Sequence, residues 1–181
     1  AVSTVTVNDG GASNAVVSRN FTVTVGAVNT RPVASVPEDQ TVAEDTVLAL
    51  AGVSVSDVDV GGGLMRVSLT ATHGTLTLGS PAGLTFTSGA NASTNLAVEG
   101  TLANLNLALA SLSYLGLTNF NGSDTVTVTV NDEGNTGTGG PLSDSKSFGI
   151  TVTAVNDAPV ANGQAVVVAE EGATGITLTG R

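Results

Sequence analysis

A short stretch that occurs twice sets the strongest constraint on how this chain can fold. Residues 154–160 read Ala-Val-Asn-Asp-Ala-Pro-Val, and residues 27–33 read Ala-Val-Asn-Thr-Arg-Pro-Val. Each copy follows alternating Thr and Val residues and precedes acidic residues a short way on. Two similar junctions, about one small-domain length apart, indicate a tandem array of similar units joined by short Pro-containing linkers.

Comparison of the chain with itself gives the boundaries of these units. Residues 5–9 match 128–132, residues 28–29 match 155–156, and residues 42–45 match 168–171. The unequal shifts place a small insertion near residues 135–140, where a surface loop tolerates it. We therefore predict that residues 1–29 are the C-terminal strands of a preceding repeat, that 30–157 form one complete repeat, and that 158–181 begin a following one.

Composition predicts the fold class. The chain is 41% hydrophobic but only 3% aromatic, and much of it is Val, Ala, Leu, Thr and Gly. Small β-branched side chains favour thin, strand-based layers, so we expect an all-β fold, an immunoglobulin- or cadherin-like antiparallel β-sandwich. One short helix is expected over residues 101–112, with Thr101 as its cap and Leu residues at spacings of three and four. His73-Gly74 is expected to be the turn of a β-hairpin joining residues 65–72 to 75–78.

The charge balance excludes several classes of partner. Fifteen acidic residues against five basic ones give a net charge of −10, so no basic face is available for nucleic acid. No apolar run reaches the roughly 18 residues that a membrane-spanning helix needs, and we expect no membrane insertion in this segment. The chain has no Cys and hence neither disulfides nor thiolate metal sites. Calcium is a common stabiliser of extracellular domains that lack disulfides.

Acidic residues near the linkers are the candidate metal ligands. Asp57 and Asp59 alternate in a glycine-rich loop, an arrangement that presents two carboxylates to a hard cation such as Ca²⁺. Further oxygen ligands would come from Glu44 and Asn29, with Asp9 and its counterpart Asp132 as additional candidates. The alternative interpretation is an ordinary solvated acidic turn, which is common in acidic β-proteins.

Six segments carry a resemblance to a known family: Val-Ala-Glu-Asp (42–45), Val-Ser-Asp-Val-Asp-Val (55–60), Ala-Thr-His-Gly-Thr-Leu-Thr-Leu (71–78), Gly-Thr-Leu-Ala-Asn-Leu-Asn-Leu-Ala-Leu (100–109), Asn-Phe-Asn-Gly-Ser-Asp-Thr-Val-Thr-Val (119–128) and Val-Asn-Asp-Ala-Pro-Val (155–160). Together they are spread over residues 42–160. This segment resembles the cadherin-like tandem β-sandwich repeats of very large bacterial surface adhesins, including calcium-dependent RTX-type adhesins.

The resemblance implies a secreted or cell-surface module that is structural or adhesive, with Ca²⁺ making the joints between repeats rigid. Its partners would be neighbouring repeats of the same protein. A cell surface and other copies of the chain are possible further partners. Glu44, Asp57 and Asp59 would bind calcium at the first joint. At the second joint the resemblance implies Asn156, Asp157 and Glu170. The first linker carries Thr30 and Arg31 where the second carries Asp157 and Ala158, so we expect a weaker site there.

Two other functions are left open. Partial end domains could complete each other between chains and form a head-to-tail filament by strand complementation. An exposed face with Thr at every second position could bind carbohydrate or ice, although only one Tyr and no Trp is available for stacking on a sugar. No enzyme is expected, because the single histidine, His73, has no nucleophile or acid at a catalytic spacing, and an exposed strand position explains Lys146, the single lysine.

Overall fold

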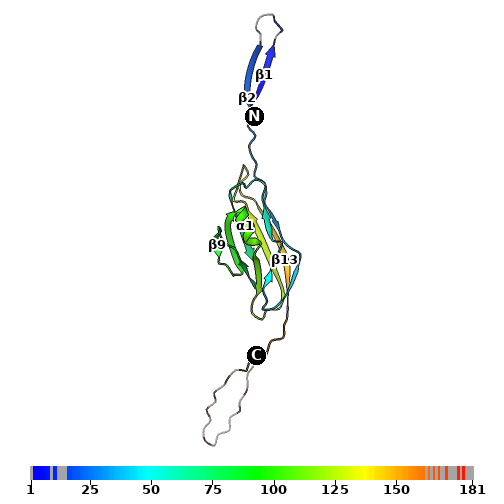
Figure 1. Ribbon diagram of the computed structural model, residues 1–181, viewed down its shortest axis with the longest axis vertical. Coiled ribbons are helices and arrows are strands. Elements are labelled where there is room, and N and C mark those ends of the chain that lie inside the picture. The colour runs from blue at the N-terminus through cyan, green and yellow to red at the C-terminus, as the bar shows by residue number, and fades with distance from the viewer. Residues whose placement is uncertain are drawn as a thin grey trace.

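The computed structural model describes residues 2–8, 10–11 and 16–161, together with residues 163, 165, 167, 170, 175 and 177. Figure 1 shows a β-hairpin at one end, a linker, and then a β-sandwich. The predicted all-β sandwich with one short helix is confirmed. Asp9 and most of residues 162–181 lie outside the described residues, and the assignment of residues 1–29 and 158–181 to neighbouring repeats stays a prediction.

Two main sheets form the sandwich. The larger has the strand order β4-β13-β12-β7-β10-β9, and the smaller has the order β5-β11-β8. The larger sheet contains β4 (Gln40–Ala43), β7 (Leu64–Thr70), β9 (Thr85–Gly89), β10 (Asn95–Thr101), β12 (Gly122–Asn131) and β13 (Ser143–Thr153). The smaller contains β5 (Leu48–Ala49), β8 (Gly74–Leu78) and β11 (Leu112–Gly116). A further pair joins β3 (Val33–Ser35) to β6 (Ser54–Ser56). All pairings are antiparallel except β4 with β13, which is parallel.

The core lies between these sheets and follows the alternation of the strands. In β12 every second residue, Val126, Val128 and Val130, is fully buried, while the intervening Thr residues face outward. The smaller sheet supplies Leu76, Leu78, Leu112 and Tyr114 to the same core. Burying one such Val or Leu side chain contributes about 1.5–3 kcal/mol, so many small side chains replace the few large anchors that the composition lacks.

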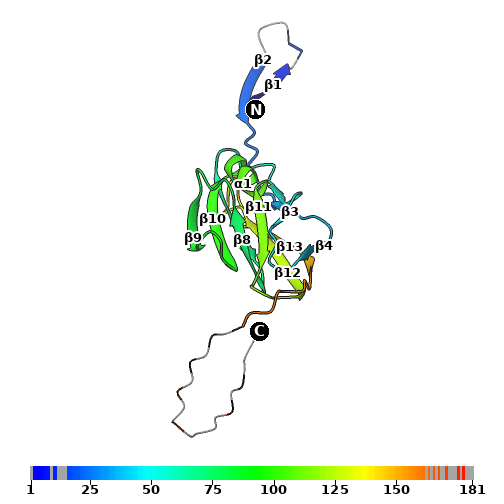
Figure 2. The same cartoon turned by 60° about the horizontal axis from the view of Figure 1, so that its bottom comes forward.

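The single helix is where the sequence predicts it. Helix α1 (Leu102–Leu109) begins after Thr101, whose hydroxyl accepts a hydrogen bond from the Asn104 N–H at 3.4 Å. Leu105 and Leu109 are buried against the core. The helix fills the crossover from β10 in one sheet to β11 in the other (Figure 2). Strand β10, a central strand of the larger sheet, is absent from the sequence-based prediction.

The predicted hairpin at His73-Gly74 is wrong. Strand β7 belongs to the larger sheet and β8 to the smaller one, so the chain crosses between sheets at this turn. The carboxylate of Asp124 holds the crossing, because it accepts hydrogen bonds from the Thr72 and His73 N–H groups, both at 2.9 Å. Period-two alternation on both sides of a turn does not reveal whether the two strands pair or face each other across the core.

The hairpin of β1 (Val2–Asn8) and β2 (Val16–Thr22) repeats the pattern of β12 and β13. Its outer face carries cross-strand hydrogen bonds from Thr4 to Asn20 and between Thr6 and Ser18. In the sandwich, Thr127 pairs with Ser147 and Thr129 with Ser145 in the same manner. The other face carries Val5, Val7 and Phe21, all about half exposed or more.

Candidate functional site

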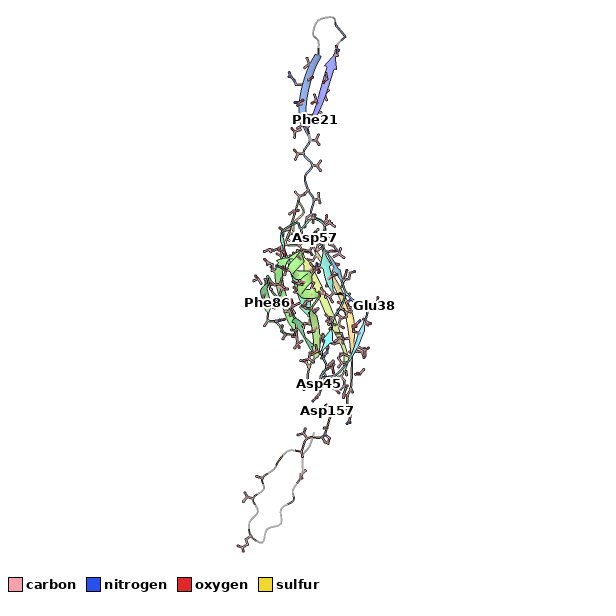
Figure 3. The ribbon with its side chains drawn as sticks, in the orientation of Figure 1. Phe21, Glu38, Asp45, Asp57, Phe86 and Asp157 are labelled. Atoms are coloured by element: carbon pink, nitrogen blue, oxygen red, sulfur yellow. The ribbon has the colours of Figure 1, made fainter. Side chains whose placement is uncertain are left out.

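The end of the sandwich that faces the hairpin is called the N-terminal pole. It consists of linker residues 27–30, the loop 57–63 and the loop 132–142. Figure 3 places Asp57 at this pole and Asp45 and Asp157 at the opposite end, the C-terminal pole.

The linker pairs with the longer loop through its backbone. The Asn29 N–H donates to the Thr138 carbonyl, and the Thr138 N–H donates to the Ala27 carbonyl, both at 2.9 Å. Gly137 permits this close approach, because a Cβ at that position would lie 2.8 Å from the Asn29 nitrogen. Its φ of +124° is also one that other residues rarely adopt. The insertion near residues 135–140 therefore provides the surface on which the linker lies.

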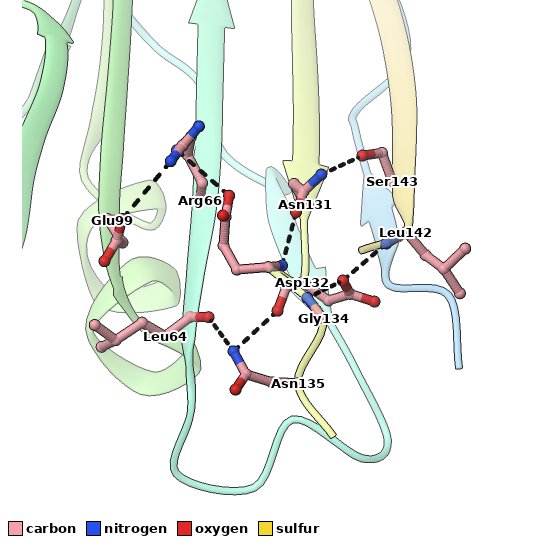
Figure 4. A network of polar contacts seen from close by, with 10 residues as sticks. Leu64, Arg66, Glu99, Asn131, Asp132, Gly134, Asn135, Leu142 and Ser143 are labelled. Atoms are coloured by element: carbon pink, nitrogen blue, oxygen red, sulfur yellow. Dashed lines mark hydrogen bonds and ion pairs between the residues drawn. The ribbon is translucent and has the colours of Figure 1, made fainter. Parts of the chain in front are cut away.

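The buried carboxylate of Asp132 binds the linker through the side chain of Asn29. Asn29 is only 6% exposed, and its Nδ2 donates to Asp132 Oδ2 at 2.7 Å and to the Gly140 carbonyl at 2.8 Å. Asp132 is fully buried, and its Oδ1 accepts the N–H groups of Gly134 and Leu142, both at 2.8 Å. Figure 4 shows how these bonds close the loop on itself. Asp132 thus ties three chain segments together through one carboxylate.

Further polar contacts beside Asp132 hold the loop to strand β7 (Figure 4). The Asn135 side chain donates to the Leu64 carbonyl at 2.8 Å. Arg66 lies 3.4 Å from Glu133 and 3.9 Å from Glu99, but its side chain is 44% exposed. Exposed ion pairs contribute little, so the backbone-directed bonds set the shape of the loop.

The acidic loop contacts the same linker from the other side. Asp59 Oδ2 accepts the Thr30 N–H at 2.8 Å. Asp57 Oδ1 accepts the N–H groups of Asp59 and Val60 at 3.0 and 3.2 Å. Thr136 Oγ1 donates to the Asp59 carbonyl at 2.7 Å, which links the two loops.

The two carboxyl groups of this loop have opposite pKa shifts. Burial, together with the neighbouring Asp59, raises the pKa of Asp57 above its ordinary value of 3.8. Burial acts in the same direction on Asp59, but the interaction with Asp57 and the Thr30 N–H outweighs it and lowers the pKa of Asp59. Two adjacent carboxyl groups cannot both ionise without cost, so Asp57 retains its proton more readily.

Three buried oxygens at this pole have no hydrogen-bond partner among the residues that the structure describes. They are Asn29 Oδ1, Asp57 Oδ2 and Asp59 Oδ1. Buried polar atoms without partners are rare in folded proteins. The structure therefore brings the predicted residues Asn29, Asp57 and Asp59 to the N-terminal pole, where Asp132 binds Asn29.

Glu44 does not belong to this group, contrary to the predicted ligand set of the first joint. Strand β4 runs parallel to β13, and its C-terminal end lies at the C-terminal pole. There Glu44, 6% exposed, accepts the Val155 N–H on Oε1 and donates its own N–H to the Thr153 carbonyl at 2.9 Å. It therefore holds the second linker by hydrogen bonds to backbone.

The remaining predicted ligands, apart from Asp9, also lie away from the N-terminal pole. Asn156 and Asp157 are exposed, and Asp157 lines a shallow pocket with Asn119, Ala158 and Val160. Glu170 is exposed. Within the part of the chain that the structure describes, no group of three or more His, Cys, Asp or Glu residues could hold a metal ion.

A second buried carboxylate, which the sequence analysis missed, lies near the C-terminal pole. Asp124 accepts the Tyr114 hydroxyl at 2.8 Å, besides the N–H groups of Thr72, His73 and Thr125. Burial and this carboxylate raise the pKa of the Tyr114 hydroxyl. His73 stacks on Phe120 with its Nδ1 4.0 Å from the carboxylate. The single Tyr, two residues after the buried Leu112, was the available signal, since a buried tyrosine hydroxyl needs a partner.

The class of protein that these features define is a β-sandwich module with polar, linker-binding poles. Among the described residues, no helix is long and apolar enough to cross a membrane. Comparison with protein families found a match to the model of the Protein GAMETE EXPRESSED 2 domain, over residues 57–138. The match starts in the acidic loop and ends in the loop that pairs with the linker. A search of curated proteins found no match.

This match corrects the predicted identity and function. The matching family is one of eukaryotic gamete proteins, associated with the gamete surface or membrane, and not one of bacterial adhesins. The prediction of a bacterial, cadherin-like RTX-type adhesin repeat, with joints made rigid by calcium, is therefore wrong. The alternatives, a filament by strand complementation and a carbohydrate- or ice-binding module, do not match this family either. The calcium-binding cadherin-like repeat also fails on geometry, because Glu44 is at the opposite pole from Asp57 and Asp59.

Proposed function

We propose that this chain is a non-catalytic β-sandwich module of an extracellular surface protein, and that its N-terminal pole holds the preceding segment of the same chain in a fixed orientation. The observation that carries the proposal is the buried bond from Asn29 to Asp132, made from the linker into the body of the sandwich. A linker that only connected two units would have its polar side chains in water.

The strength of the contact supports this role. The buried bond from Asn29 to Asp132 has a carboxylate acceptor, and such bonds contribute about 1.5–3 kcal/mol. The bond from Thr30 to Asp59 is exposed to solvent and contributes less. The two backbone bonds between the linker and Thr138 contribute about 0.5–1.5 kcal/mol each. Ordering a few linker residues costs about 1–2 kcal/mol per residue. The terms are comparable, so loss of one charged bond is enough to release the linker.

The use of the acidic residues supports a non-enzymatic role. Asp57, Asp59 and Asp132 each accept backbone N–H groups, and such bonds fix loop shape. Glu44 does the same for the second linker. The extracellular placement is supported by the match to a family of gamete-surface proteins.

The binding of Ca²⁺ at the N-terminal pole stays a prediction. The ligand set available there is smaller than the one that the sequence suggested. The unpaired oxygens of Asn29, Asp57 and Asp59 are of the hard type that Ca²⁺ binds, but Ca²⁺ takes six to eight ligands. Water or the preceding segment would supply the others. Titration calorimetry of the full chain with CaCl₂ tests this: we expect saturable binding that the Asp57→Asn variant weakens at least tenfold, and equal weak binding by both proteins contradicts it.

The proposed holding of the linker is tested by hydrogen exchange. Because Asn29→Ala removes a bond of about 1.5–3 kcal/mol, it is expected to speed exchange of the Asn29 and Thr138 amides by roughly 10- to 100-fold. Asn156→Ala, at the exposed counterpart in the second linker, is the matched control and leaves these amides unchanged. Unchanged exchange in both variants would contradict the proposal.

A further inference from the structure

The chain contains three Asn-x-Ser/Thr sequences, the acceptor pattern for N-linked glycans on surface loops. They are Asn20-Phe21-Thr22, Asn91-Ala92-Ser93 and Asn121-Gly122-Ser123. The pattern alone does not separate them, but the environments of the three Asn side chains differ.

Asn91 uses its side chain to extend the smaller sheet. Its Nδ2 donates to the Leu78 carbonyl at 2.9 Å, and its Oδ1 accepts the Leu78 N–H at 2.8 Å. The residue is partly buried. A glycan on Nδ2 would have to fit where that nitrogen now faces strand β8, so a modified Asn91 is incompatible with this fold.

Asn20 lies within a strand and is partly engaged. It is exposed in β2, and its Oδ1 accepts the Thr4 hydroxyl at 2.8 Å across the hairpin. Its side chain is one member of the polar pairs that cover the outer face of β1 and β2. This bond orients the amide along the hairpin surface.

Asn121 is free of such constraints. It lies at the turn immediately before β12, and Asn121, Gly122 and Ser123 are all exposed. The Asn121 side chain makes no hydrogen bond within the described part of the chain. Gly122, which follows it, has a φ of +134°, a backbone conformation that residues other than glycine rarely adopt.

We infer that Asn121 is an acceptor site for an N-linked glycan; this inference rests on the extracellular placement proposed above. Nδ2 forms a bond to the anomeric carbon of an oligosaccharide, the bond from that carbon to the pyrophosphate of a lipid carrier breaks, and Nδ2 loses one proton. The glycan would stand at the C-terminal pole, on the same side of the sandwich as Asn119 and Asp157, which line the pocket beside the second linker.

The test is secretion of the full chain from eukaryotic cells behind a cleavable signal, followed by mass spectrometry of intact glycopeptides. We expect a glycan on Asn121 and a bare Asn91, and loss of the Asn121 glycan in Ser123→Ala with no change in melting temperature. An unmodified Asn121, or a glycan on Asn91 in folded protein, would overturn the inference. The fraction of Asn121 that carries a glycan is measured in both the retained and the secreted protein. Failure of the protein to leave the cell would count against the extracellular placement, while the glycan on the retained protein would still test the acceptor site.

Discussion

At the residue scale, two buried carboxylates organise the two ends of the sandwich. Asp132 gathers Asn29, Gly134 and Leu142 at the N-terminal pole, and Asp124 gathers Tyr114 and three backbone N–H groups near the other. Asp124 lies in β12 on the face that otherwise buries Val, and Asp132 directly follows the last residue of that strand. A buried charge is tolerated only where its bonds are complete, and these two meet that condition.

The first prediction concerns Asp124. Asp124→Ala leaves one hydroxyl and three backbone N–H groups without their acceptor, and each unpaired buried donor costs about 1–3 kcal/mol. We expect a loss of at least about 3 kcal/mol in the free energy of unfolding, measured by urea denaturation. Tyr114→Phe removes a single bond and should lose about 1 kcal/mol. Equal effects of the two substitutions would contradict the role of Asp124 as a hub.

The second prediction concerns pH. Because the pKa of Asp57 is raised in the folded chain, the protonated form favours folding; its contribution to stability is largest below the unfolded pKa and is lost as pH rises through the folded pKa. The proposed binding of Ca²⁺ needs the ionised carboxylate of Asp57, so the Ca²⁺ affinity is expected to rise with pH over the same range. Calorimetry between pH 4 and pH 7 checks this, with Asp57→Asn as the control. Affinity that is independent of pH would contradict a role for Asp57 as ligand.

The candidate site was only partly predictable from the sequence. The sequence identifies Asn29, Asp57, Asp59 and Asp132 as candidates, and all four lie at the N-terminal pole. Glu44 was placed with them because it follows the linker closely, but the parallel pairing of β4 with β13 carries it to the opposite pole. Spacing along a chain does not show at which end of a strand a residue will lie when the strand's partner and direction are unknown.

At the scale of elements, helix α1 and the two long strands of each hairpin were predictable, since cap, period and alternation all agree. The crossing at His73-Gly74 was not, because a carboxylate 51 residues away determines it. Strand β10 was missed for a related reason: its residues Leu96, Ala97 and Val98 are all buried, so period-two alternation is absent. A strand that is buried on both faces lacks the alternation of apolar and polar residues by which a strand with one exposed face is recognised in a sequence.

The third prediction belongs to the loop that receives the linker. Gly137→Ala combines a strained backbone, at φ of +124°, with a Cβ only 2.8 Å from Asn29 N. We expect the linker to detach while the sandwich stays folded, seen as faster exchange of the Thr138 amide with little change in melting temperature. Gly62→Ala in the neighbouring loop is the matched control, since its Cβ would meet nothing within 4 Å. Protection of Thr138 that survives Gly137→Ala would contradict the close packing of linker on loop.

At the scale of the whole molecule, the two linkers are held by different means. The first is bound on two sides, by Asp59 and by the loop around Asp132 and Thr138. The second is held at Val155 by Glu44, and residues 156–161, which follow, are exposed. We therefore expect the segment before the sandwich to be more firmly oriented than the segment after it. That the N-terminal pole fixes the orientation of the preceding segment is the central claim about this module.

The most direct test of that claim is a distance measurement between the hairpin and the sandwich. Since the chain has no Cys, Thr22→Cys and Thr125→Cys give two unique sites for spin labels, both exposed. Double electron–electron resonance is expected to show one narrow distance distribution, which broadens in Asn29→Ala and stays narrow in Asn156→Ala. A broad distribution in the labelled parent protein, or one that Asn29→Ala leaves unchanged, would contradict the claim that the N-terminal pole holds the preceding segment.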